Sequence, residues 1–124
     1  MKAKMILAAC LLFLSVWQAL GAQTVYPKRE FRGAWIQCVN GQFQGMPPRQ
    51  MQAMLISQLD RLEKAGINAI VFQVRAECDA LYRSSYEPWS RFLTGVQGQA
   101  PAPVWDPLQF MIDECHKRGM ELHA

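Results

Sequence analysis

The sequence predicts an α/β fold in which three parallel strands alternate with two helices, in the order β-α-β-α-β. Residues 67–74 form a short apolar run, interrupted by Gln73 and closed by Arg75, that is typical of a strand buried on both faces of a parallel sheet. One junction also occurs twice, at residues 62–67 and 115–120: a helix ends in basic residues, a glycine follows, and an apolar strand begins. Strands that alternate with helices in this way form parallel sheets with right-handed crossovers.

Residues 1–22 have the pattern of a secretory signal peptide. Lys2 and Lys4 precede an apolar run over residues 5–17, and small residues follow before Gln23. The run is too short to span a bilayer, which takes about 20 residues. We interpret Cys10, inside the run, as part of the signal core and not as a lipid anchor. We therefore expect an exported protein with no stable membrane span after cleavage.

Composition excludes several classes of partner. Removal of residues 1–22 takes away two of the 13 basic residues and none of the 10 acidic ones, so the net charge falls from +3 to +1. Because no basic patch interleaved with aromatic residues remains, we expect no nucleic-acid partner. No C-x-x-C or H-x-x-x-H spacing occurs, which argues against a zinc site, so we assign no metal ligands. We also expect no cofactor. The oligomeric state stays open.

Three cysteines remain after the signal peptide: Cys38, Cys78 and Cys115. An odd number is not a disulfide framework. Cys38 and Cys78 both lie near the ends of predicted strands on the same side of the sheet, so they are the pair that an exported chain could oxidise. In the alternative interpretation all three are unpaired and act as small apolar fillers.

The first strand and helix occupy residues 31–66. The strand covers 31–39 and ends at the turn signal Asn40-Gly41. The helix begins at Pro47-Pro48, because proline is tolerated in a first helical turn, and Gly66 ends it in a left-handed conformation. We expect Trp35 to lie in the core more readily than to serve as a ligand platform. The apolar face of the helix consists of Met51, Met54, Leu55, Leu59 and Leu62.

The second helix and third strand follow the same pattern. Asp106 is a good N-cap, Pro107 suits the first helical position, and Gly119 ends the helix. A strand then starts at 120 and continues to 124. Three strands cannot close an eight-stranded barrel, so residues 23–124 predict the incomplete N-terminal part of a larger domain. The apolar stripe of this helix consists of Leu108, Met111, Ile112 and Cys115.

Polar residues gather at the carboxyl end of the central strand, where α/β folds build their sites. One face of the strand is wholly apolar and consists of Ile70, Phe72 and Val74. The other changes from apolar to polar along the chain and consists of Ala69, Val71, Gln73 and Arg75. The connection that follows is 17 residues longer than the first one. Such elongation serves a site more often than a fold.

Five residues are candidates for binding a substrate: Gln73, Arg75, Asp79, Tyr82 and His123. The guanidinium of Arg75 could hold a carboxylate or sugar hydroxyls, or it could form an internal ion pair with Asp79 or with a carboxylate from a strand beyond this segment. Asp79 could accept from sugar hydroxyls or cap a turn in its own loop. The ring of Tyr82 suits stacking on a pyranose. His123 is either a site residue or a satisfied interior histidine.

Further along the loop, Tyr86 and Trp89 could also stack on a sugar, but packing of the long loop explains them at least as well. Glu121 shares a strand face with His123, and we expect it to be a buried, paired carboxylate and not a catalytic one.

Several motifs together resemble one family, the bacterial glycosyl-hydrolase-like family ten. The resemblance covers essentially the whole chain after the signal peptide. It implies that strands 31–39, 67–75 and 120–124 are the first three of a (β/α)8 TIM barrel in a periplasmic, cell-surface or extracellular protein. The motifs are FRGAWI at 31–36, GINAIVFQVR at 66–75, DALY at 79–82, S-YEPWS-FLTG at 85–95, WDPL at 105–108 and HKRGMELHA at 116–124.

The resemblance implies an exported glycoside hydrolase acting on a polysaccharide or cell-wall glycan. Hydrolysis needs two carboxyl groups that flank the scissile bond, and we assign neither within this chain. We expect the segment to supply part of the substrate-binding face and to be inactive alone. The alternative is a non-catalytic carbohydrate-binding or cell-wall-associated barrel. A weaker third possibility is a metal-dependent hydrolase that uses His123 with further ligands.

Overall fold

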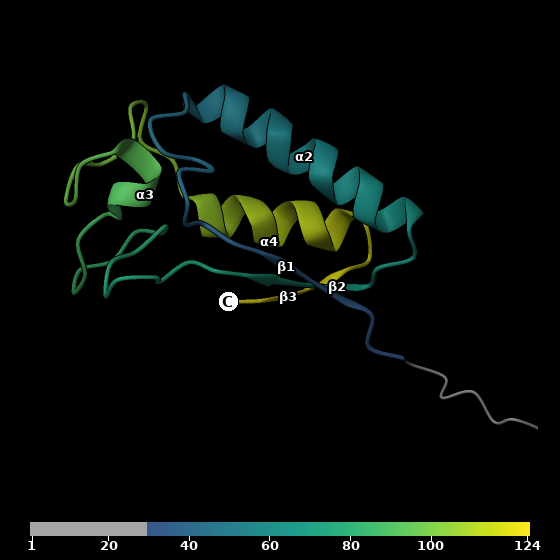
Figure 1. Ribbon diagram of the computed structural model, residues 1–124. Coiled ribbons are helices and arrows are strands. Elements are labelled where there is room, and N and C mark those ends of the chain that lie inside the picture. The colour runs from purple at the N-terminus through teal and green to yellow at the C-terminus, as the bar shows by residue number, and fades with distance from the viewer. Residues whose placement is uncertain (1–29) are drawn as a thin grey trace, which may run out of the picture. The chain divides into compact units, whose positions relative to one another are not determined.

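Three parallel strands, β1 (Gly33–Ile36), β2 (Ala69–Phe72) and β3 (Glu121–His123), form one sheet in the order β1-β2-β3 (Figure 1). The computed structural model describes residues 30–124, so the predicted signal peptide lies outside the described residues. Helices α2 (Pro48–Lys64) and α4 (Pro107–Lys117) connect the strands. The predicted β-α-β-α-β order and the parallel sheet are confirmed.

The strands are shorter than the predicted ranges because the backbone ladder ends early. Gln73 donates its N–H to the Ile36 carbonyl at 2.9 Å. One step further, the Cys38 N–H is bonded at 3.2 Å by the Gln73 side-chain oxygen and not by backbone. The backbones of β1 and β2 therefore separate just beyond Phe72, where the long connection to α4 begins.

One face of the sheet carries the core. Figure 1 places α2 and α4 on the same side of the strands. The largest fully buried apolar side chains on this side are Phe43, Phe72, Met51, Leu55, Leu59, Ile70, Leu81 and Met111. Most of the predicted apolar stripes of both helices therefore pack inward, as expected. Neither helix, nor any other within residues 30–124, is long and apolar enough to cross a bilayer.

The two helix–strand junctions have the same geometry, as the repeated sequence pattern predicts. Gly66 (φ 81°) and Gly119 (φ 67°) both adopt the left-handed conformation. Ile67 donates to the Leu62 carbonyl at 3.0 Å, and at the second junction Met120 donates to the Cys115 carbonyl at 3.0 Å. Each bond satisfies a carbonyl at the end of its helix and turns the chain into the next strand.

The opposite face of the sheet is uncovered by the described residues. Trp35 is 65% exposed there, so its predicted place in the core is wrong. The reason is positional: Trp35 alternates with the inward-facing Ile36, and both helices lie on the Ile36 side. Glu121 is on the same uncovered face, and its predicted burial is also wrong, although it does pair with His123 at 3.3 Å.

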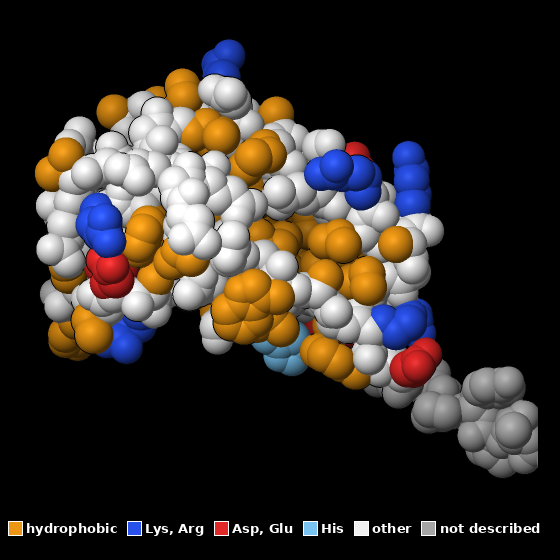
Figure 2. Space-filling model, in the orientation of Figure 1, with side chains coloured by type: hydrophobic (Ala, Val, Ile, Leu, Met, Phe, Trp, Pro, Cys, Tyr) orange, Lys and Arg blue, Asp and Glu red, His pale blue; other side chains and the backbone are white. Residues whose placement is uncertain are grey.

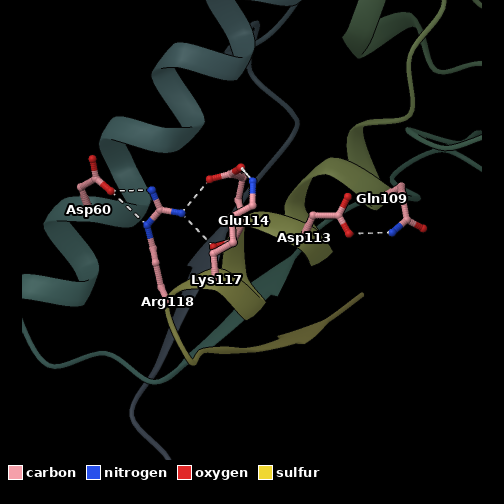
Figure 3. Close-up of polar contacts among 6 residues, drawn as sticks. All are labelled: Asp60, Gln109, Asp113, Glu114, Lys117 and Arg118. Carbon is pink, nitrogen blue, oxygen red and sulfur yellow. Dashed lines mark hydrogen bonds and ion pairs between the residues drawn. The ribbon is translucent and has the colours of Figure 1, made fainter.

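A charged cluster joins the two helices (Figure 3). The Arg118 guanidinium lies between carboxylates from both, donating to Asp60 of α2 at 2.6 Å and to Glu114 of α4 at 2.8 Å. Lys117 also pairs with Glu114, whose side chain is only 11% exposed. The arginine and lysine lower the pKa of Glu114, while Glu114 and Asp60 raise the pKa of Arg118. The cluster holds together the helix ends that precede β2 and β3.

The three described cysteines are free, so the structure contains no Cys38–Cys78 disulfide. Cys38 and Cys115 are buried, which confirms their interpretation as apolar fillers. Burial raises the pKa of both thiols to about 11, and for Cys38 the charge of Asp79 adds to this effect. Cys78 is exposed and has a positive φ of 55°, so the filler interpretation is wrong for it.

Candidate functional site

The long connection between β2 and α4 folds back against the carboxyl end of β2. Leu81 donates its N–H to the Val74 carbonyl at 2.9 Å. Ala80 pairs with the segment around Trp89: it donates to the Pro88 carbonyl and accepts from Ser90, both at 2.9 Å. Trp89 packs partly buried against the core, which confirms its predicted role in loop packing. These bonds fix the loop over the polar end of the strand.

Two of the predicted site residues, Arg75 and Tyr82, meet at Glu87. Arg75 forms an ion pair with one carboxylate oxygen of Glu87, and the Tyr82 hydroxyl donates to the other at 3.1 Å. Arg75 thus forms an internal ion pair, which was one of the two alternatives, but its partner is Glu87 of the same loop and neither Asp79 nor a carboxylate from a further strand. Half of the Arg75 side chain stays exposed.

The backbone at Glu87 is held in place by the side chain of Ser84. The Ser84 hydroxyl oxygen accepts from the N–H groups of Tyr86 and Glu87, both at 3.1 Å. Burial, together with the hydrogen bond and the charge of Glu87, raises the pKa of the Tyr82 phenol. Tyr82 is therefore a neutral donor at neutral pH, with its ring in a fixed position.

A second ion pair lies in the same loop. Arg91 donates through two nitrogens to the two oxygens of Glu77, each at 2.7 Å, in the bidentate geometry of a strong arginine–carboxylate pair. Arg91 belongs to α3 (Arg91–Thr94), a four-residue helix that was not predicted from the sequence. Ser90 caps this helix and Gly95 ends it. The hydrogen bond from Arg91 lowers the pKa of Glu77.

Asp79 is fully buried beneath these pairs. One oxygen accepts from the Glu77 N–H at 3.3 Å, and the other has no hydrogen-bond partner among the described residues. This is the predicted alternative in which Asp79 caps its own loop. Because the side chain has no exposed surface, it does not reach a ligand in this arrangement.

Gln73 and His123 lie apart from the Arg75–Glu87–Tyr82 group. The Gln73 side chain joins the ends of β1 and β2 through its bond to Cys38. His123 is level with Trp35 and Val71 across the sheet. Arg75 is four residues beyond Val71, about 13 Å along the strand direction. His123 is half exposed, and its ring meets Phe31 edge-on at 5.7 Å, so it is not the buried interior histidine of the alternative.

Neither Glu87 nor the role of Arg91 was predicted from the sequence. Periodicity cannot reveal Glu87, because in an irregular loop no repeat shows which side chain turns back toward a strand. The signal that could have found it is its place between Tyr86 and Pro88 inside the longest of the family-like motifs. Tyr86 is 95% exposed and therefore does not pack the loop as one alternative had it.

Chemically, the arrangement suits recognition of a neutral, hydroxylated ligand. It presents half-exposed guanidinium groups, a phenol held by a carboxylate and an exposed aromatic ring. Planar donors beside aromatic rings can bind hydroxyl groups and stack on an apolar sugar face. No group of three or more His, Cys, Asp or Glu side chains within residues 30–124 could hold a metal ion.

Comparisons with known proteins agree on one family. Residues 30–124 match the family described as glycosyl hydrolase-like 10. Over 100 residues the chain is 43% identical to glycosyl hydrolase YngK of Bacillus subtilis, covering 77% of this chain and 19% of that protein. Over 76 residues it is 49% identical to glycosyl hydrolase DigH of Escherichia coli K12, covering 61% of this chain and 17% of that protein.

The chain thus matches less than a fifth of the length of these relatives. The family match itself takes in every described residue, including the loop that carries Arg75, Tyr82 and Glu87. The chain therefore belongs to the glycosyl hydrolase-like 10 family.

Proposed function

We propose that this protein is an exported glycoside hydrolase acting on a polysaccharide or cell-wall glycan, and that the described segment supplies part of the sugar-binding face. Family membership and the names of the two relatives support the reaction class. The observation that carries the proposed binding role is the Arg75–Glu87–Tyr82 group at the carboxyl end of a parallel sheet. The signal-peptide pattern of residues 1–22 supports export.

The proposal includes a barrel. Further strands would continue the sheet beyond β3 and close it against β1, enclosing the face that carries Trp35, Val71 and His123. Support comes from the exposure of Trp35 and Phe31, 65% and 62%, which is high for large apolar side chains on a sheet. A parallel sheet is normally covered on both faces. In such a barrel the Arg75–Glu87–Tyr82 group lies at the mouth, where barrel enzymes bind their substrates.

The bond-breaking carboxyl groups are proposed to lie outside this segment. A glycosidase needs one protonated and one ionised carboxyl group facing the scissile bond. Glu77 and Glu87 are both engaged with arginines, and Arg91 lowers the pKa of Glu77, which is the reverse of what a general acid requires. Asp79 is buried. These residues suit binding and positioning better than proton transfer.

The test combines turnover and binding on the same sample of the 124-residue chain. We expect no release of 4-nitrophenol from 4-nitrophenyl β-glucoside or 4-nitrophenyl β-N-acetylglucosaminide. We expect weak binding of cello- or chito-hexaose by calorimetry, reduced about ten-fold by Tyr82→Ala because an aromatic contact is lost. Arg49→Ala, a change of an exposed residue on α2, should leave binding unaltered. Turnover by this chain, or equal binding by the Tyr82 variant, would refute the proposed division of roles.

A non-catalytic carbohydrate-binding barrel is the second candidate. The observation that favours it is the engagement of Glu77 and Glu87 in ion pairs. The same two assays on a longer form of the protein separate the candidates: a hydrolase binds and turns over a glycan, whereas a binding protein binds without turnover.

A further inference from the structure

Asp106 uses both of its carboxylate oxygens, although a helix cap needs only one. Oδ1 accepts from the Gln109 N–H at 3.0 Å, which caps α4 as the sequence predicts. Oδ2 accepts from the Arg83 N–H, also at 3.0 Å, in a residue 23 positions earlier in the chain. Arg83 belongs to the long connection that carries the candidate sugar site. Capping explains the first bond, whereas the second joins α4 to the site loop.

The residues on either side of Asp106 fix its position. Its own backbone is extended (φ −112°, ψ 105°), which is the conformation that a following proline favours. Pro107 is fully buried in the first turn of α4. Trp105 packs against the core, and its ring meets the Phe110 ring edge-on at 5.6 Å. Asp106 therefore holds the Arg83 N–H from a fixed point at the start of α4.

Tyr82 lies between two backbone anchors that come from different elements. On one side, Leu81 donates its N–H to the Val74 carbonyl just beyond β2, at 2.9 Å. On the other side, Arg83 donates its N–H to Asp106. The backbone before Tyr82 is thus tied to the sheet, and the backbone after it is tied to α4. Together the two anchors set the direction in which the phenol leaves the chain.

We propose that Asp106 is a positioning residue of the sugar site, which acts through the Arg83 N–H to hold the Tyr82 hydroxyl against Glu87. The hydroxyl reaches Glu87 at 3.1 Å only if the backbone at Tyr82 is correctly placed. Without the Asp106 bond the phenol has more freedom, and binding a sugar must then supply the lost order. The inference rests on the proposed sugar-binding role of Tyr82, and it adds a residue from outside the loop.

Two substitutions separate positioning from capping. Serine and asparagine cap helices about as well as aspartate does. Serine has a single oxygen on a shorter side chain, and asparagine replaces one of the two oxygens by an NH2 donor. Neither residue can give Gln109 and Arg83 an oxygen each. Asp106→Ser therefore keeps the cap of α4 and removes the bond to Arg83, and Asp106→Asn is a second variant closer in shape to aspartate.

The test uses the 124-residue chain labelled with ¹⁵N and with ¹³C at Cζ of tyrosine. In Asp106→Ser we expect the Arg83 amide to exchange with solvent about ten-fold faster, because its acceptor is gone. Burial and the hydrogen bond and charge of Glu87 raise the pKa of the Tyr82 phenol, so this pKa should fall toward its ordinary value of 10. The affinity for cello- or chito-hexaose should fall about five-fold.

The effect should be local. We expect amide shifts around Tyr82 and in the first turn of α4. Ala34 and Leu62 line the hollow between β1 and α2, where Figure 2 shows hydrophobic side chains gathered, and their amides should not shift. Shifts of equal size in this hollow would mean that the substitution loosens the whole core, and the proposal would be overturned.

Gly119→Ala is the control for a loss of stability alone. It strains the left-handed turn after α4 (φ 67°), and nothing lies within 4 Å of the added methyl group. The phenol pKa and the hexaose affinity should both stay at their wild-type values. An unchanged phenol pKa in Asp106→Ser would show that Asp106 only caps α4, and an unchanged hexaose affinity would show that its position does not matter for binding; either result overturns the proposal.

Failure of the sugar site is recognised separately. If the wild-type chain bound neither hexaose, the proposed function of the segment would be refuted. The Arg83 exchange rate and the phenol pKa need no sugar, so they would still decide whether Asp106 positions Tyr82.

Discussion

Glu87 decides how Arg75 and Tyr82 are arranged at the site. It holds the Arg75 guanidinium with one oxygen and the Tyr82 hydroxyl with the other, so both are ordered before any ligand arrives. Ordering polar groups in advance reduces the entropy lost on binding. The same contact takes Arg75 out of competition for a ligand carboxylate, and a neutral, hydroxylated ligand suits the group better than an anion.

The cysteines give a prediction at the scale of single residues. In a Cys10→Ser variant at pH 8, iodoacetamide should label Cys78 rapidly and both Cys38 and Cys115 very slowly. A thiol with a pKa of about 11 is about one-thousandth thiolate at that pH, and burial slows its reaction further. Peptide mass spectrometry with time gives the rates.

Unfolding in urea is the control, because it should make all three cysteines react alike. If Cys38 and Cys78 both resisted labelling until a reductant was added, the two would form a disulfide in solution and the free state would be wrong.

Residue-level prediction from sequence succeeded where the backbone pattern dictates the outcome. Alternation placed Ile70, Phe72 and Val74 on the buried face, as found. It did not reveal that Arg75 turns toward Glu87, since that contact depends on a loop that folds back by 12 residues. The predicted burial of Trp35 was wrong for another reason. Apolar character predicts burial only where another element covers that face of the sheet.

At the scale of elements, the two glycine junctions were predictable because only a residue without a Cβ adopts a positive φ cheaply at a helix end. The short α3 was not, since four residues carry no periodicity. Its only sequence signals are the Ser90 cap and Gly95 at either end.

Gly66→Ala should lower the free energy of unfolding by about 1 kcal/mol, the cost of a left-handed L-residue. Nothing lies within 4 Å of the added methyl group, so the effect is backbone strain and not a clash. Urea unfolding followed by circular dichroism measures it.

Ser57→Ala, on the exposed side of the same helix, is the matched control and should change stability by less than about 0.5 kcal/mol. An equal loss in both variants would mean that Gly66 does not set the junction.

For the molecule as a whole, the Arg118 cluster makes stability depend on pH. The pKa of Glu114 is below its ordinary value of 4.5 in the folded state. The stability from its ionised form is therefore fully present above about pH 4.5 and is lost as the pH falls through the lower folded pKa. Glu114→Gln should lower stability at pH 7 and flatten this acid dependence.

Asp113→Asn is the control, because Asp113 is an exposed carboxylate of the same helix whose only side-chain partner within residues 30–124 is Gln109 (Figure 3). Arg118→Met should cost roughly 2 kcal/mol at pH 7. That is less than for a wholly buried pair, since Asp60 is half exposed and Lys117 remains beside Glu114. Urea unfolding between pH 3 and 7 gives the free energy of unfolding of each variant. If this free energy changed with pH in the same way for Glu114→Gln and wild type, the assignment to Glu114 would be wrong.

The position of the sugar is the most direct test of the proposed function. We expect titration of the ¹⁵N-labelled chain with cello- or chito-hexaose to shift the Arg75 side-chain Nε–H and the amides of Tyr82, Tyr86 and Glu87. Shifts confined to Trp35, Val71 and His123 on the uncovered face, or no shift with either sugar, would contradict a sugar site at the carboxyl end of the sheet.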